Sequence, residues 1–217
     1  MLGKLLKKEF TLTMHPTVPV MLLLGTMVLI PNYPYLVAFF YVTLSLFFTC
    51  LNARENNDAV FSLSLPVKKA DLVRSRILFT CIIELFSILL TAPFTVLSAK
   101  IAPQGNAAGM DANLVLLGQG LLLFGLFNLV FFASYYKDIS RVGVPFVIAS
   151  VVSFVLVGAD VCLCYAVPYV KNVLDTPGFV NAAPKAVCLI SGALSFAALT
   201  LLSYKISTKR FLKLDIK

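Results

Sequence analysis

The residue types that most often carry out catalysis or bind metals are scarce in this chain. His15 is the only histidine among 217 residues, which excludes zinc sites of the HExxH type and other multi-histidine metal sites. A serine nucleophile activated by histidine is disfavoured as well, because His15 is expected at the edge of a membrane. Counting alone does not exclude a serine–lysine dyad, although every lysine lies in a loop or at the edge of an apolar run.

ATP binding and cysteine chemistry are also disfavoured. The P-loop pattern GxxxxGK[ST] is absent from the sequence, so the chain does not bind ATP through such a loop. All five cysteines fall within apolar runs, where a small buried side chain is the simpler interpretation; they are Cys50, Cys81, Cys162, Cys164 and Cys188. We therefore predict that the chain is not an enzyme by itself and has no catalytic, cofactor-binding or metal-ligating residues.

Two carboxylates inside apolar runs, Glu84 and Asp160, are costly enough to need an explanation. Glu84 is expected about 10 Å inside its run, at 1.5 Å per residue, facing a cavity or an interhelical polar group. The sequence favours neither a functional nor a purely structural role for Glu84. For Asp160 we favour contact with outer water or a neighbouring helix. With Gln119 and Asn128 of the fourth run, they are the candidate polar residues of a cavity.

The only sizeable polar stretch between long apolar runs is residues 54–76, RENNDAVFSLSLPVKKADLVRSR. It carries five Lys or Arg, but it also carries four large apolar residues: Val60, Phe61, Leu63 and Leu65. About twenty residues cannot build a core of their own, so a soluble partner is the simplest cover for these side chains. A solvated basic loop is the alternative, and it leaves the apolar residues unexplained.

The same stretch predicts two helices separated by a proline. A short helix is expected from Arg54 to about Leu63, with Glu55 and Asp58 near its N-terminal end, where the helix dipole favours carboxylates. Pro66 then ends it. A second helix is expected to begin near Lys68 and to continue into the next apolar run.

The composition is that of an all-α, polytopic membrane protein. The chain is 59% hydrophobic and 13% charged, with a mean hydropathy of +0.93. Six runs approach the length that crosses a bilayer: residues 16–30, 33–52, 77–99, 112–136, 142–167 and 184–204. Gly118 and Gly125 of the fourth run are seven apart, which allows close helix packing within the protomer. The whole chain is expected to form one transmembrane domain.

The distribution of basic residues predicts the orientation. Of 18 Lys and Arg, 15 lie in residues 1–15, 53–76, 137–141 and 205–217. This bias predicts that these segments and both termini are cytoplasmic. The net charge of +8 then reflects topology and attraction to anionic lipid, whereas nucleic-acid binding is disfavoured because the charges are scattered over four segments. No nucleic-acid partner is expected.

The N-terminal residues predict an amphipathic helix in the membrane interface, over residues 1–15 and before Pro16. Its lysines Lys4, Lys7 and Lys8 are expected largely on the polar side. The apolar side would carry Leu2, Leu5, Leu6, Phe10 and Leu12.

These features together resemble the permeases of ABC-2 type exporters. The resemblance covers the six-span topology and the N-terminal helix, and its specific motif lies within residues 54–76. The motif consists of an acidic residue (Glu55), the sequence SLPV (64–67), a basic pair, and Arg74 or Arg76 leading into the third span. The most similar members are the short bacterial permeases that export phenol-soluble modulins, bacitracin and lantibiotics.

The resemblance implies a bacterial plasma-membrane exporter with two permease protomers, identical or different, and two separate ATPase subunits that bind ATP and Mg²⁺. Residues 54–66 would form the coupling helix: Val60, Phe61, Leu63 and Pro66 would fill a cleft of the ATPase, with Glu55 and Asp58 at its rim. The substrate would be an amphipathic or hydrophobic molecule, such as an antimicrobial or modulin-like peptide. A secondary transporter, or a membrane assembly or structural protein, is the alternative; an intramembrane enzyme ranks third.

Overall fold

The computed structural model describes residues 2–101, 103–178 and 180–214, and every regular element in these ranges is helical. The elements in chain order are α1 (Leu2–Lys8), η1 (Glu9–Thr13), α2 (Thr17–Leu23), η2 (Leu24–Leu29), α3 (Leu36–Glu55), α4 (Asp58–Leu63), α5 (Lys69–Ile101), α6 (Leu114–Tyr135), α7 (Gly143–Ala166), η3 (Val170–Leu174) and α8 (Ala182–Leu212). The predicted all-α fold is confirmed. In the described chain, five helices are long and apolar enough to cross a membrane, or six if one bent pair forms a single span.

The bent pair is the N-terminal region, in which Leu2–Thr13 and Thr17–Leu29 meet at 87°. A bend of this size suits a helix in the interface followed by a span that rises from it. Leu5 is buried against the bundle, whereas 72% of Leu12 is exposed. The residues after Lys8 form η1, a π-helix in which Glu9 and Thr13 are buried.

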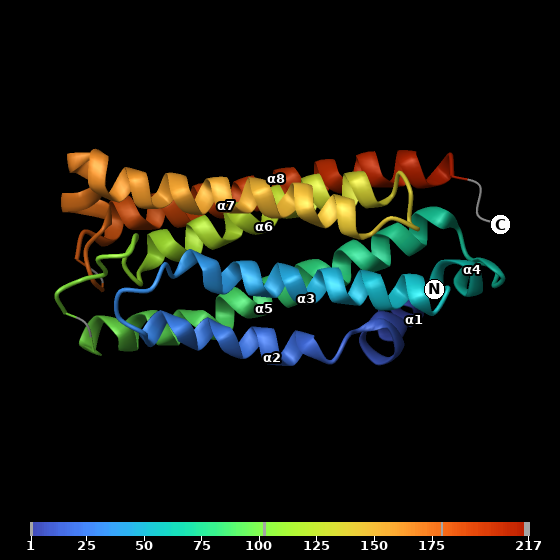
Figure 1. Cartoon of the computed structure of the whole chain (residues 1–217), viewed down its shortest axis with the longest axis horizontal. Coiled ribbons are helices and arrows are strands. Elements are labelled where there is room, and N and C mark those ends of the chain that lie inside the picture. The colour runs from blue at the N-terminus through green and yellow to red at the C-terminus, as the bar shows by residue number, and fades with distance from the viewer. Residues whose placement is uncertain (1, 102, 179, 215–217) are drawn as a thin grey trace.

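Two helices extend beyond their apolar runs, and the start of α5 at Lys69 confirms the helix predicted to begin near Lys68. The run 77–99 is part of α5, which begins eight residues earlier, and the run 184–204 is part of α8, which continues to Leu212. Both extensions lie at one end of the bundle, together with α1 and α4 (Figure 1). We call this the basic end, because the described Lys and Arg other than Lys100, Lys171 and Lys185 belong to segments that meet there.

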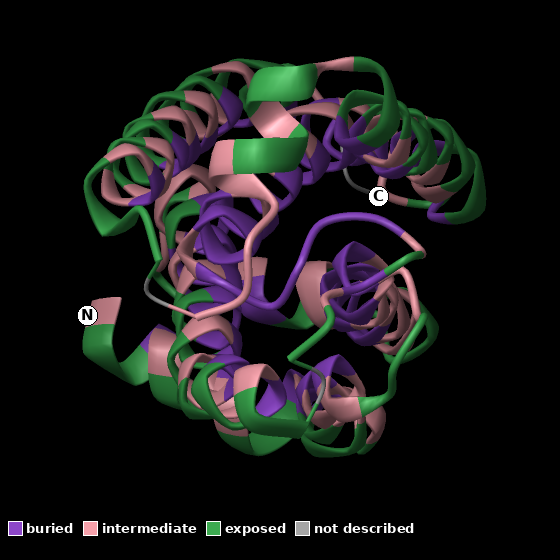
Figure 2. Ribbon diagram, turned by 90° about the vertical axis from the view of Figure 1, so that its left-hand side faces the viewer, coloured by how far each residue is buried: buried purple, intermediate pink, exposed green. Residues whose placement is uncertain are grey.

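The centre of the bundle is α6, which packs most closely against α8. A side chain at Gly118 would place its Cβ 2.7 Å from the carbonyl oxygen of Cys188, and one at Gly192 would meet the Gly118 carbonyl. A Cβ at Gly125 would lie 3.0 Å from the Cα of Phe196. The glycines therefore bring two helices of one protomer into backbone contact, as the sequence predicted. Viewed along the bundle, the buried parts of the helices turn toward its middle (Figure 2).

Candidate functional site

Helix α4 is a short helix at the tip of the basic end (Figure 1). The predicted helix from Arg54 to Leu63 is broken, because α3 continues to Glu55 and α4 begins only at Asp58. The chain turns between them at Asn57, whose φ of 50° is a left-handed conformation that asparagine tolerates better than most residues. Pro66 follows α4 and precedes α5, as predicted.

The outer surface of this segment is apolar. Phe61 is 61% exposed, Leu65 is 48% exposed and Val60 is 44% exposed. We call these three residues the apolar tip. Leu63, which the sequence analysis grouped with them, instead packs partly buried against a core to which α3, α5, α6, α7 and α8 contribute. The physical reason is the helical register, which turns Leu63 toward the bundle while Phe61 points away from it.

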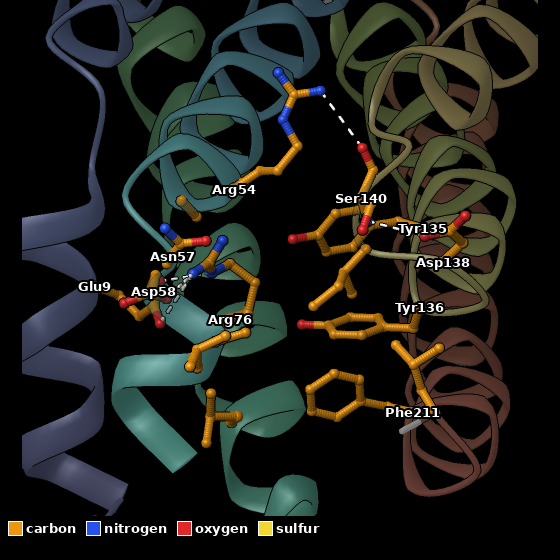
Figure 3. Close-up of a pocket in the computed structure, with 16 residues that line it drawn as sticks. Glu9, Arg54, Asn57, Asp58, Arg76, Tyr135, Tyr136, Asp138, Ser140 and Phe211 are labelled. Carbon is orange, nitrogen blue, oxygen red and sulfur yellow. Dashed lines mark hydrogen bonds and ion pairs between the residues drawn. The ribbon is translucent and has the colours of Figure 1, made fainter. Parts of the chain in front are cut away.

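Behind the apolar tip lie four charged side chains in direct contact, Lys8, Glu9, Asp58 and Arg76 (Figure 3 shows three of them). Arg76 Nε lies 2.6 Å from Glu9 Oε2, and Arg76 Nη2 donates to Asp58 Oδ2 at 2.9 Å. Lys8 Nζ donates to Asp58 Oδ1 at 2.8 Å and lies 3.2 Å from Glu9 Oε1. We call these residues the charge cluster.

The charge cluster is buried and electrically balanced. The side chains of Glu9 and Arg76 are 1% and 7% exposed, and those of Lys8 and Asp58 are 13% and 14% exposed. Two positive charges offset two negative charges, so each ion has a partner that compensates for its lost hydration. Because its members come from α1, η1, α4 and α5, the cluster ties the N-terminal segment and α4 to the start of a membrane helix.

The charge cluster changes two expectations. Asp58, expected at the rim of a partner's cleft, is bound within the protein, and Arg76, expected to lead into the third span, is turned inward by two carboxylates. The sequence analysis missed Glu9 and the inward position of Lys8. The sequence contained one indication of an ionic role for Glu9, because Glu9 is the only acidic residue before Arg54 and its neighbours are basic or apolar.

A pocket of about 280 Å³ separates the charge cluster from the α6–α7 connection. Arg76 and Asp58 lie on one side of it, and the aromatic rings of Tyr135, Tyr136 and Phe211 lie on the other (Figure 3). Its charged and aromatic lining allows contact with polar groups from the basic end, where it opens beside α4.

Glu84 lies deeper, in a hydrogen-bonded contact among three helices. It is fully buried, and its Oε2 accepts a hydrogen bond of 2.8 Å from Asn128 Nδ2 of α6. Asn128 Nδ2 also lies 3.4 Å from Thr200 Oγ1 of α8, and Ser203 Oγ donates to the Asn128 carbonyl at 2.6 Å. Of the two environments predicted for Glu84, the interhelical polar group is the one found.

Glu84 belongs to a line of polar residues along one face of α5. Its members recur every three or four residues, which places them on the same side of a helix, and all are buried: Arg76, Thr80, Glu84, Ser87, Thr91, Thr95 and Ser98. This line runs from the charge cluster toward the opposite end of the bundle. Sequence reasoning found Glu84 but missed the line, although its spacing was visible.

We expect Glu84→Gln to fold normally but to alter coupled transport, because glutamine keeps an acceptor for Asn128 while removing the charge. The measurement is substrate-stimulated ATP hydrolysis and export by the reconstituted transporter, beside thermal stability. Asp160→Asn, a matched change at the other membrane carboxylate, should be mild. Unchanged transport and stability in Glu84→Gln would assign Glu84 a packing role alone.

Asp160 and Gln119 pair with each other at the opposite end of the bundle. Gln119 Nε2 donates to Asp160 Oδ1 at 2.6 Å, and the backbone N–H of Met110 donates to Asp160 Oδ2 at 3.3 Å. Asp160 thus contacts a neighbouring helix, as favoured from the sequence.

At the same end of the bundle, Asp175 accepts a hydrogen bond of 2.8 Å from the backbone N–H of Asp111, and burial raises the pKa of Asp175 to about 6. The four candidate cavity residues therefore form two separate pairs, Glu84–Asn128 and Gln119–Asp160.

The comparisons with known proteins identify the family. A family model described as ABC-2 family transporter protein matches residues 4–211, which contain the apolar tip, the charge cluster and both polar pairs. Comparison with curated proteins and with solved structures gave no match. A match over nearly the whole chain, joined to five or six described helical segments long and apolar enough to cross a membrane, establishes the assignment. The chain therefore belongs to the ABC-2 family of transporter proteins and is a multi-pass membrane permease of an ABC transporter.

Proposed function

We propose that the chain is the permease of an ATP-driven exporter and that a separate ATPase subunit docks on the apolar tip. The observation that carries this proposal is the pairing of an exposed apolar surface with a buried ionic link to a membrane helix. Val60, Phe61 and Leu65 are exposed at the tip, and Asp58 of the same segment is bound to Arg76 of α5. A partner that binds the apolar tip can therefore move α5 through the ion pair between Asp58 and Arg76.

The docking surface consists of an apolar centre and a polar rim. Burying a side chain such as Phe61 stabilises an interface by roughly 1.5–3 kcal/mol, and aromatic anchors dominate many interfaces. Leu65 takes the place of Leu63 in this surface, and Pro66 lies beside it, exposed. Glu55, with its side chain 61% exposed, remains the rim carboxylate, whereas Asp58 acts inside the protein.

Motion of the tip would reach the membrane through α5. The charge cluster resists separation, because removing a buried ion from its partner leaves an uncompensated charge. From Arg76, eight residues or about 12 Å along α5 lead to Glu84, which bonds to Asn128 of α6. We infer that ATPase closure shifts α5 against α6 and α8 and so alternates access to the substrate.

The basic end is proposed to face the cytoplasm, in the plasma membrane of a bacterium, because of the strong bias in Lys and Arg. Single cysteines introduced at Gln104, Ala107 or Asn172, which are exposed at the opposite end, should react with an impermeant thiol reagent in intact cells. Cysteines at Asn56 or Ser64, both exposed at the basic end, should react only after permeabilisation. Labelling of these two positions in intact cells would contradict the orientation.

The proposed substrate is an amphipathic or hydrophobic molecule, such as an antimicrobial or modulin-like peptide, carried between two permease protomers. Support comes from an apolar groove of about 600 Å³ between α3 and α7. Phe40, Phe146 and Phe154 line it, and the Phe40 and Phe154 rings lie 4.7 Å apart between centroids. Such a surface suits apolar side chains better than an ion.

Co-purification tests the function. The full-length permease should retain a separate ATPase subunit, and the reconstituted pair should hydrolyse ATP faster when an amphipathic peptide is added. A Walker-motif lysine variant of that ATPase should abolish export without preventing assembly. Peptide transport driven by an ion gradient in the absence of any ATPase would instead indicate a secondary transporter.

A further inference from the structure

A second groove opens at the basic end between α7 and α8. It encloses about 850 Å³ and is bounded by the end of α6 and the α6–α7 connection. It exists because α7 and α8 both pack against α6 and scarcely touch each other. This groove is separate from the apolar tip and from the phenylalanine groove between α3 and α7.

Three cationic side chains line the groove, Lys137, Arg141 and Arg210. Among the described residues of the lining, the one carboxylate is Asp138, which lies 3.2 Å from Arg141 Nε, so the described lining is positive overall. Arg210 Nη1 donates to the carbonyl oxygen of Ala133 near the end of α6, which fixes the guanidinium in place. A guanidinium has five N–H donors, and this contact uses one of them.

The wall beside the cations is apolar. Val144 and Ile148, one turn apart at the start of α7, are 61% and 47% exposed. The basic groups therefore stand where the apolar surface of a membrane helix begins. That arrangement places cations at headgroup depth and apolar side chains at acyl-chain depth.

We propose that this groove binds one anionic glycerophospholipid, with its phosphate held by Arg141, Arg210 and Lys137 and an acyl chain lying against Val144 and Ile148. Arginine favours phosphate because its planar fork offers two parallel hydrogen bonds. Free phosphate would leave the apolar wall uncovered. A two-fold contact with a second copy would bring like charges together, which disfavours that occupant.

The test uses the full-length protein with phosphatidylglycerol and phosphatidylcholine as probes, and native mass spectrometry counts the bound lipid. We expect phosphatidylglycerol to bind as one retained molecule, whereas phosphatidylcholine exchanges freely. The triple variant Lys137→Gln/Arg141→Gln/Arg210→Gln should weaken phosphatidylglycerol binding by about tenfold or more. A control, Lys4→Gln/Lys7→Gln/Lys205→Gln, removes the same charge from exposed positions at the same end and should change binding by less than about twofold.

Two further variants separate the parts of the site. Lys137→Gln/Arg141→Gln keeps the Arg210 contact with α6 and should still lose most of the selectivity for phosphatidylglycerol. Ile148→Trp should reduce binding by filling the apolar wall, with every cation intact. Soluble glycerophosphoglycerol, which lacks acyl chains, should not compete.

Three outcomes would overturn the proposal. Equal losses in the triple variant and its control would mean diffuse attraction to a basic surface. Competition by glycerophosphoglycerol would mean an anion site without lipid. Dissociation of a dimer in the triple variant, with lipid retention unchanged, would mean that the groove seats a second copy of the chain.

Discussion

Phe61→Ala is expected to weaken association with the ATPase subunit by about 10- to 100-fold. The phenyl ring is 61% exposed on the apolar tip, and its burial in a partner would contribute roughly 1.5–3 kcal/mol. Since about 1.4 kcal/mol corresponds to a tenfold change in affinity, the loss spans one to two decades. Binding of the purified ATPase to the permease in nanodiscs measures it, with ATP hydrolysis and export as companion readouts. Stability of the permease should not change, because the ring contributes little to its own core.

Matched variants show whether the effect belongs to the tip. Leu12→Ala removes an apolar side chain that is 72% exposed at the same end and should leave ATPase binding unaltered. Lys68→Gln should have a small effect that fades with added salt, because an exposed charge is screened. Unaltered assembly in Phe61→Ala, together with lost assembly in Lys68→Gln, would mean that this segment binds through charge. The apolar tip would then have no role in docking.

Arg76→Met is expected to destabilise the permease by about 3–5 kcal/mol. Arg76 is the shared partner of Glu9 and Asp58, and its removal leaves the Glu9 carboxylate, 1% exposed, with Lys8 as its remaining cation. Thermal or denaturant unfolding in detergent measures the loss. Lys8→Gln should cost less, because its charge lies nearer to solvent and pairs mainly with Asp58.

The double variant Glu9→Gln/Arg76→Met should recover much of that stability, since an uncharged pair replaces a buried ionic one. It should nevertheless transport poorly, because Asp58 of α4 would lose its ionic contact with α5. Recovery of stability without recovery of export would identify the charge cluster as a coupling element. Full recovery of both would leave the cluster a role in folding alone.

Much of the architecture follows from local properties of the sequence. Apolar runs near the length of a bilayer must become helices, because unpaired backbone groups are too costly in lipid. Most of each predicted run lies in a helical segment of the structure, and small residues at 118 and 125 allowed the close contact with α8. The start of α5 at Lys69 was predicted from the polar segment, whereas the extension of α8 to Leu212, beyond its apolar run, was not.

By itself, the sequence determined the membrane class, the helical fold, the single polar segment and its exposed Phe61, because these depend on composition and on spacing along one helix. Only the tertiary structure decided the charge partners. Glu9 and Arg76 are 67 residues apart and meet because the π-helix turns Glu9 inward toward α5. The tertiary structure likewise decided that Asp58 forms an ion pair inside the protein and that Leu63 is half-buried. It also decided that Glu84 and Asp160 form hydrogen bonds with different residues of α6. Pairing between distant charges depends on how the helices rotate against one another, and a single sequence does not encode that rotation in any local pattern.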